Sequence, residues 1–244
     1  MKIIYFAYEY YCNHGGRTHA RSFFASLSRH PLVSKAVIFP TDEEMGTATA
    51  MDGAQFGGFR PVGKKVARYL WRNVVPEWIR RQINLFYPSP RIYRSFSSVI
   101  REERPDALVL RIGGMFRFMQ RLRRDFPDLK ICIEFNATGF DESKEWIPWR
   151  NRWRREEAHQ FGFADSICVV SGYLQRYLVS LNPTLAERIT VNPNGVDMEL
   201  FKPLGADIRR ESRQEMKIPD EAVVLGYVGG MESFRRNIYT GYLY

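Results

Sequence analysis

The chain has 244 residues, of which 36 are basic and 27 acidic, and a formal net charge of +9. Hydrophobic residues make up 45% and charged residues 26%, which are ordinary values for a globular protein and exclude a disordered or a fibrous chain. No apolar run approaches the length of a transmembrane helix, and the first one, interrupted by Glu9, is too short for a secretion signal.

Six short apolar runs along the chain predict β-strands, and helical patterns separate most of them. The predicted strands are Lys2–Tyr8, Lys35–Phe39, Ala107–Arg111, Lys130–Phe135, Ser166–Val170 and Arg188–Asn192. The predicted helices are Gly16–Arg29, Lys64–Phe86, Ile92–Glu103, Phe116–Phe126, Ile147–Phe161 and Tyr173–Leu181. Continuous Val, Ile and Leu runs joined through helices indicate a parallel sheet that is covered on both faces. The expected fold is a doubly wound, Rossmann-like α/β domain that ends near Pro203.

Three cysteines, Cys12, Cys132 and Cys168, show no metal-ligand spacing, and the last two lie in strand-like runs. Reduced, buried thiols in a cytoplasmic protein are favoured over a disulfide framework. The sequence also predicts a loop beside the ligand cleft at Thr41–Gly63, where Gly, Ala, Thr and Met replace the periodic pattern.

The basic excess is concentrated between Arg60 and Arg101, where ten basic residues stand against the single acid Glu77. Two tryptophans and several aliphatic residues alternate with these cations at near-helical spacing. Such a segment can lie peripherally on an anionic membrane, such as the inner face of a cell membrane. The alternative is a solvated helix whose apolar stripe packs on the sheet. No nucleic-acid-binding motif supports nucleic acid as a partner.

The first predicted strand is followed by Gly15 and Gly16 at the start of a helix, with His19 close behind. Free backbone N–H groups at a helix N-terminus suit a phosphate or a sugar oxygen. The spacing is not that of a dinucleotide fingerprint. For His19, packing against its helical neighbours remains the alternative to a functional role.

Polar residues also end the third and fourth predicted strands, where ligands bind in sheets of this kind. Arg111 ends the third strand, and Glu134 and Asn136 lie two apart on one face of the fourth. A charged residue in so apolar a strand requires a reason. Pairing of Glu134 with Arg111 would be a structural reason, and binding of an acceptor hydroxyl a functional one.

The stretch "RITVNPNGVDMELFKPL" combines the sixth strand with Asn194-Gly195, a pair that predicts a turn with positive φ. A strand followed by P-N-G-V-D and then F-x-P resembles the interdomain crossover of family 4 of the retaining glycosyltransferases, which have the two-domain GT-B fold. The Gly-Gly turn before a helix with a histidine, "EFN", "ADSICVVSGYLQRYL" and "VVLGYVGG" are also similar to that family.

The resemblance implies an acceptor-binding domain over residues 1–203 and the start of a truncated donor-binding domain over 204–244, with Val223–Val228 as its first strand. Gly15 and Gly16 would then approach the reacting phosphate. The remaining implied substrate-side residues are His19, Arg111, Glu134, Asn136, Ser171 and Asn194, with His19 and Glu134 as catalytic candidates. The implied donor-phosphate residues are Gly229, Gly230, Arg235 and Arg236. Gly230 stands where the family has its first basic residue.

The family moves a sugar from a nucleotide diphosphate sugar to an acceptor hydroxyl with retention of configuration, and requires neither a metal ion nor another cofactor. The resemblance therefore implies a glycan or lipid-linked acceptor and a role in polysaccharide or glycolipid synthesis. The alternative is a non-catalytic module that binds a membrane or a glycan and has no donor site.

Overall fold

The computed structural model describes residues 1–7, 10, 15–40, 74, 90–111, 117–138, 150–203 and 205–226. The chain divides into two compact units, Met1–Asn194 and Gly195–Tyr244, and each is described by itself. The predicted helix over Lys64–Phe86 and the predicted loop over Thr41–Gly63 lie outside the described residues, apart from Val74.

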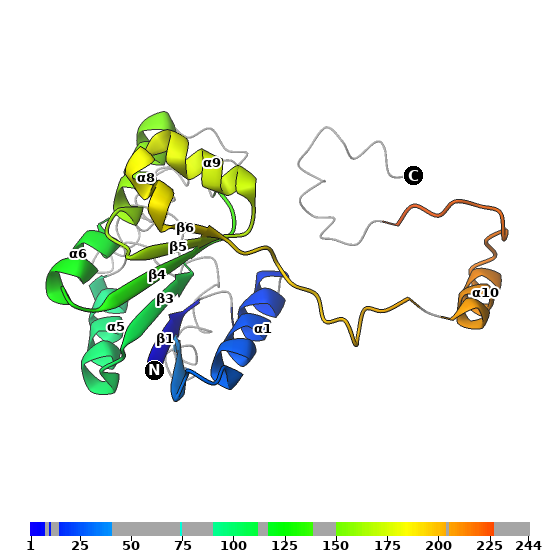
Figure 1. Cartoon of the computed structure of the whole chain (residues 1–244), viewed down its shortest axis with the longest axis horizontal. Helices are drawn as coiled ribbons and strands as arrows, with labels where there is room; N and C mark the ends of the chain where they lie inside the picture. The colour runs from blue at the N-terminus through cyan, green and yellow to red at the C-terminus, as the bar shows by residue number, and fades with distance from the viewer. Residues whose placement is uncertain are drawn as a thin grey trace. The chain divides into compact units, whose positions relative to one another are not determined.

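Six parallel strands form one sheet in the order β2-β1-β3-β4-β5-β6 (Figure 1). The strands are β1 Lys2–Phe6, β2 Lys35–Phe39, β3 Ala107–Arg111, β4 Lys130–Phe135, β5 Ser166–Val169 and β6 Ile189–Val191. The predicted Rossmann-like α/β fold is therefore confirmed. Three predicted strands have the observed bounds, and the other three are one or two residues too long in the prediction.

Helices cover both faces of this sheet. They are α1 Gly15–Arg29, α5 Pro90–Glu103, α6 Phe118–Asp125, α8 Arg150–Phe161 and α9 Gly172–Leu181, followed by the 3-10 helix η2 Pro183–Arg188. Helix α1 lies on one face and packs on Ile3 and Tyr5 of β1, whereas the other four helices lie on the opposite face with Ile4 and Phe6 (Figure 1). In the part of the chain that the structure describes, no helix has the length and hydrophobicity needed to cross a membrane.

Successive strands are added to opposite sides of β1, so the winding of the chain through the sheet changes direction there. The chain passes from β1 to β2 on one side and then to β3 on the other. In an open α/β sheet, ligands bind outside the carboxyl ends of the strands at such a switch point. The fold therefore directs attention to the carboxyl ends of β1 and β3.

The predicted turn at Asn194-Gly195 is wrong. Neither residue has a positive φ, and both lie in a stretch without regular structure after β6. An Asn-Gly pair makes a tight turn where the chain must fold back on a preceding strand. Among the described residues, β6 is the last strand of the sheet, so no following strand pairs with it through a turn at this position.

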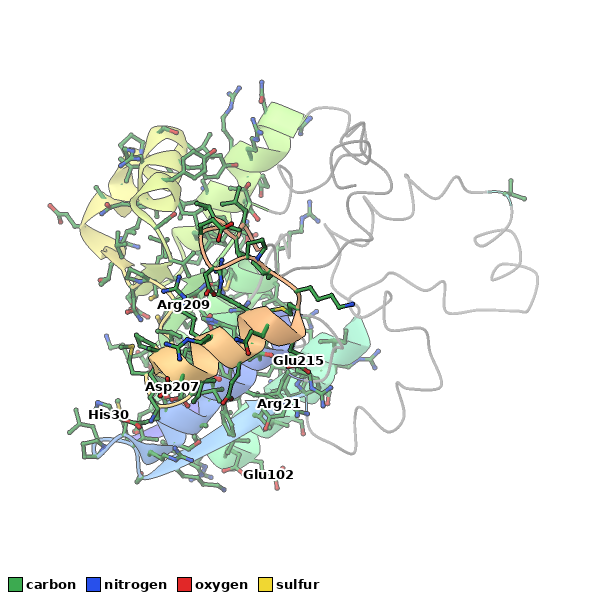
Figure 2. All side chains as sticks on the ribbon, turned by 90° about the vertical axis from the view of Figure 1, so that its right-hand side faces the viewer. Arg21, His30, Glu102, Asp207, Arg209 and Glu215 are labelled. Atoms are coloured by element: carbon green, nitrogen blue, oxygen red, sulfur yellow. The ribbon has the colours of Figure 1, made fainter. Side chains whose placement is uncertain are left out.

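The second unit contains one described helix that the sequence pattern did not predict, α10 Ala206–Glu215, whose two ends are marked by Asp207 and Glu215 in Figure 2. The helix ends at Glu215. Lys217, two residues later, has a φ of 54°, which allows the N–H of Ile218 to donate to the carbonyl of Arg213 at 2.8 Å. This hydrogen bond and the one from Lys217 to Gln214 form a Schellman motif.

The predicted strand over Val223–Val228 is not formed in its described part, Val223–Gly226. Val223 and Leu225 are almost fully exposed. A strand is stable only when a neighbouring strand accepts its backbone hydrogen bonds and its side chains are buried. The described residues of the second unit supply neither.

Candidate functional site

Glu134 of β4 is the centre of a polar cluster in the first unit. Its side chain is buried, with 5% of its surface exposed. Its Oε1 accepts hydrogen bonds from Nδ2 of Asn136 at 2.8 Å and from Nη1 of Arg111, and lies at hydrogen-bond distance, 2.6 Å, from Nε2 of His19. Its Oε2 accepts from the hydroxyl of Tyr5 at 2.7 Å. Four side chains thus surround one carboxylate, and we call these five residues the Glu134 cluster.

Strand register and alternation bring the cluster together. Arg111 and Glu134 are directly opposite each other on β3 and β4. Tyr5 on β1 faces the same side of the sheet as Val109 on β3, which is the side that α1 covers. Asn136 follows Glu134 by two residues, the spacing that keeps two side chains on one face of a strand. The cluster therefore spans the carboxyl ends of the strands around the switch point.

Helix α1 supplies His19, its fifth residue. The imidazole stacks on Phe23 with 9° between the ring planes, and Phe23 in turn contacts the ring of Tyr5 at 5.0 Å between centroids. Residues four apart lie on one face of a helix, so this face of α1 packs on the sheet. The His19 side chain still has 27% of its surface exposed, which leaves it accessible to a ligand.

The carboxyl group of Glu134 is ionised at neutral pH. Burial raises its pKa, but the hydrogen bond from Asn136, the charge of Arg111 and the hydrogen bond from Tyr5 outweigh burial and lower the pKa below its ordinary value. An ionised carboxylate only accepts hydrogen bonds. As an anion, Glu134 holds its neighbours in place. It has no proton to donate at neutral pH, and its lowered pKa makes it a weak base.

Asn136 has an unmet hydrogen-bonding atom. Its Nδ2 donates to Glu134, whereas its Oδ1 is buried and accepts no hydrogen bond. The amide cannot be turned round, because Oδ1 would then face the carboxylate. A buried acceptor without a donor is uncommon and requires an explanation, of which an absent ligand or water is one.

The other predicted site residues lie elsewhere. Ser171 is the N-cap of α9, where its Oγ accepts a hydrogen bond from the N–H of Leu174 at 3.3 Å. Asn194 is exposed at the end of the first unit. Gly15 and Gly16 begin α1, as the sequence predicted. Whether these residues contact a substrate remains a prediction.

Several predictions fall outside the described residues. Gly229, Gly230, Arg235 and Arg236, which the resemblance assigned to the donor phosphate, lie there. So does most of the basic segment Arg60–Arg101, of which only Val74 and residues 90–101 are described.

Tyr5 is the one member of the Glu134 cluster that sequence reasoning missed. In an apolar strand a tyrosine is read as a core residue, and its ring is indeed fully buried. A buried tyrosine hydroxyl needs a hydrogen-bond partner, and only the pairing of strands shows that this partner is Glu134.

Cys132 and Cys168 are free thiols and only half-buried, so the prediction of buried thiols holds in part. Burial raises the pKa of both thiols, which keeps them protonated at neutral pH. Among the residues that the structure describes, no group of three or more His, Cys, Asp or Glu side chains is arranged to hold a metal ion.

Comparison with known families identifies the domain. Residues 52–200 match the family described as Glycosyltransferase Family 4, which is more than half of the chain. The chain belongs to this family. Three of the five members of the Glu134 cluster, at 111, 134 and 136, lie in the matched region, and the other two, at 5 and 19, precede it. No curated protein sequence gives a significant match to this family 4 chain.

Similar solved structures share little sequence with the chain. Alr3699/HepE of Anabaena, in complex with UDP, is 12% identical over 89% of this chain and 50% of its own, with a TM-score of 0.49. The UDP-GlcNAc 2-epimerase from Neisseria meningitidis, bound to UDP-GlcNAc, is 11% identical over 91% and 55%, with a TM-score of 0.44. The N-terminal domain of Candida albicans trehalose-6-phosphate phosphatase is 12% identical over 88% and 54%, with a TM-score of 0.46. The family 4 chain spans about half the length of these solved chains.

Proposed function

We propose that this glycosyltransferase family 4 domain is the acceptor-binding part of an enzyme that transfers a sugar from a nucleotide diphosphate sugar to an acceptor hydroxyl with retention of configuration. The observation that carries the proposal is the Glu134 cluster, which gathers polar side chains from α1, β1, β3 and β4 at the switch point of the sheet. An acceptor of the glycan or glycolipid class supplies the hydroxyl.

In this proposal the members of the cluster have different roles. Glu134 and Arg111 are positioning residues, because each is largely buried and they pair with each other. His19 and Asn136 meet the acceptor, because His19 is partly exposed and Oδ1 of Asn136 accepts no hydrogen bond from the described part of the chain. Gly15 and Gly16 offer the N–H groups of the first turn of α1 to the donor phosphate.

The donor would be held mainly by residues after the crossover. Gly229, Gly230, Arg235 and Arg236 are the sequence candidates for contact with the diphosphate. During transfer the acceptor oxygen bonds to the anomeric carbon, the bond from this carbon to the diphosphate oxygen breaks, and the diphosphate leaves with the electron pair. The acceptor proton passes to the departing phosphate oxygen. Cations and backbone N–H groups stabilise the charge that develops there.

The direct test is an assay of the protein encoded by the complete reading frame with UDP-, GDP- and ADP-sugars and a mixture of glycan and polyprenyl-phosphate-linked acceptors. We expect one nucleotide sugar to release its diphosphate in an acceptor-dependent manner, with retention seen by NMR of the product. Release of no diphosphate from any donor, together with binding of glycans or anionic vesicles, would instead support the non-catalytic module.

We expect the 244-residue chain to bind these nucleotide sugars weakly, because the resemblance gives it only the beginning of a donor-binding domain. We also expect it to transfer sugar poorly, because positioning both substrates supplies a large part of the rate. Calorimetric titration with the same nucleotide sugars measures this. Tight, saturable binding with turnover would place the whole donor site within these 244 residues. Peripheral attachment through Arg60–Arg101 is tested by sedimentation with anionic and neutral vesicles at low and high salt.

A further inference from the structure

We infer that Glu134 fixes the polarity of the site. With the His19 imidazole neutral, His19 and Asn136 both present hydrogen-bond acceptors, and the site takes the hydroxyl groups of a neutral sugar rather than a phosphate or a carboxylate. This inference rests on the proposed function for the sugar nature of the ligand.

The first step is the proton on His19. Nε2 of His19 lies 2.6 Å from Oε1 of Glu134, and the ionised carboxylate can only accept. The proton of the neutral imidazole is therefore on Nε2. Nδ1 is left with its lone pair, so it is an acceptor.

The second step is the orientation of the Asn136 amide. Its Nδ2 donates to the same oxygen of Glu134 at 2.8 Å, which turns Oδ1 away from the carboxylate. Oδ1 is buried and has no hydrogen-bond donor. The carboxylate of Glu134 thus takes the N–H donors of His19 and Asn136. Their acceptor atoms, Nδ1 and Oδ1, are left for a ligand.

The third step is the charge at the site. The negative charge of Glu134 is offset by Arg111, which pairs with it and has only 11% of its side chain exposed. A phosphate or carboxylate would bring lone pairs against the two acceptors. An ammonium group would find no net negative charge to attract it. A neutral hydroxyl group can donate to one of these acceptors and needs no net charge at the site.

The proton on His19 can be measured directly in the 244-residue chain. In alkaline buffer, the 15N chemical shifts of its two ring nitrogens distinguish the two tautomers. The signals are assigned by their loss in His19→Gln. We expect the proton on Nε2 in the wild-type chain and a mixture of tautomers in Glu134→Gln. A proton on Nδ1 in the wild type overturns the inference.

The ligand preference is measured with named probes on the same spectra. The probes are methyl glucoside and methyl mannoside, each beside its 6-carboxylate. We expect the neutral probes to shift the His19 signals and the carboxylates to leave them unchanged. Asn136→Ala should weaken binding of the neutral probes about tenfold, because the substitution removes one buried hydrogen bond to the probe. Asn151→Ala, the same change at an exposed position of α8, should leave it unchanged.

Equal binding of the carboxylates, or unchanged binding in Asn136→Ala, overturns the inference. Failure of the proposed function gives a different result. If the complete protein transfers no sugar, while the proton is on Nε2 and the neutral probes bind through Asn136, the polarity of the site is supported and only the transfer reaction is contradicted.

Discussion

Two clusters of an arginine with a carboxylate lie at opposite ends of the same sheet, and their partners differ. The Glu134 cluster lies at the carboxyl ends of β3 and β4, and side chains surround its carboxylate. The second cluster, Arg123 with Asp165, lies at the amino ends of β4 and β5, and its partners are mainly backbone groups.

In the Arg123–Asp165 cluster, Arg123 donates to the carbonyl oxygens of Phe163, Pro127 and Leu129 and to Oδ2 of Asp165. The same Oδ2 accepts from the N–H of Ile131, the second residue of β4. The contacts of Arg123 join α6 to the loops before β4 and β5, and the contact of Asp165 with Ile131 joins the second of these loops to the start of β4. The cluster therefore fixes the loops that lead into β4 and β5.

The difference separates a structural cluster from a functional candidate. Backbone partners satisfy Arg123 and Asp165, and Arg123 stands far from the switch point. In the Glu134 cluster, Asn136 retains a buried acceptor that no donor meets, and His19 remains partly exposed. Sheets of this kind bind ligands at the carboxyl ends of their strands. A polar side-chain group that lacks a hydrogen-bond partner there is a candidate to bind a ligand.

The largest expected effect is from Glu134→Ala. The substitution removes the counterion of the buried Arg111 and the acceptor of Tyr5 and His19. Removal of one partner of a buried ion pair lowers the free energy of unfolding by about 3–5 kcal/mol. Urea denaturation measures it. Glu199→Ala, at a glutamate with 94% of its side chain exposed, should change stability by less than about 0.5 kcal/mol.

Arg123→Ala should lower the free energy of unfolding by about 2–3 kcal/mol, because charged hydrogen bonds to several carbonyl groups are lost. The exposed Arg124, with 72% of its side chain exposed, is the matched control and should have little effect. Binding of the neutral sugar probes per folded molecule should stay unchanged. A stable Arg123→Ala variant with lost probe binding would contradict the division between the two clusters.

His19→Gln should have the opposite pattern. Because the imidazole is partly exposed, the melting temperature should change little, whereas sugar transfer by the complete enzyme should fall roughly 10- to 100-fold through the loss of one substrate contact. His30, at the end of α1 (Figure 2), is exposed, and His30→Gln is the control. A loss of stability without a selective loss of transfer would show that His19 only packs on its neighbours.

Ser171→Ala tests a predicted substrate contact against an observed cap. Loss of the hydrogen bond from Leu174 to Oγ should cost about 1 kcal/mol of stability. Ser171→Asp, which retains an N-cap acceptor, should restore most of it. If Ser171→Ala is as stable as the wild type but transfers sugar poorly, Ser171 contacts the substrate and its cap is unimportant.

The smallest expected effect is on acid stability. Burial raises the pKa values of Glu134 and Asp165, but hydrogen bonds and nearby cations outweigh it, so both values are lowered in the folded state. A lowered folded-state pKa adds stability above the ordinary pKa of about 4, and this stability is lost as the pH falls through the folded-state pKa. The gap in stability between the wild type and Asp165→Asn should therefore narrow below about pH 4. A constant gap down to about pH 2 would show that Asp165 is not ionised in these contacts.

The sequence determined the main features of the first unit. Continuous apolar runs predicted all six strands, because strands buried on both faces must be apolar along their whole length. Glu134 stood out because a charge is rare in such a strand, and pairing with Arg111, which the structure shows, was one of the two reasons that the sequence suggested. The alternation of side chains also placed Asn136 beside Glu134.

The tertiary structure decided which groups converge. Tyr5 and Glu134 are 129 residues apart, and no local pattern links them. The role of Ser171 as an N-cap depended on where α9 begins. The absence of a turn at Asn194-Gly195 depended on β6 being the last strand among the described residues. Likewise, α10 contains only two apolar residues, Ala206 and Ile208, and the contacts of Arg213 with the carbonyl oxygens of Pro219 and Ala222 fix its end. Local sequence sets which element forms, whereas hydrogen bonds between distant segments exist only after the sheet has assembled.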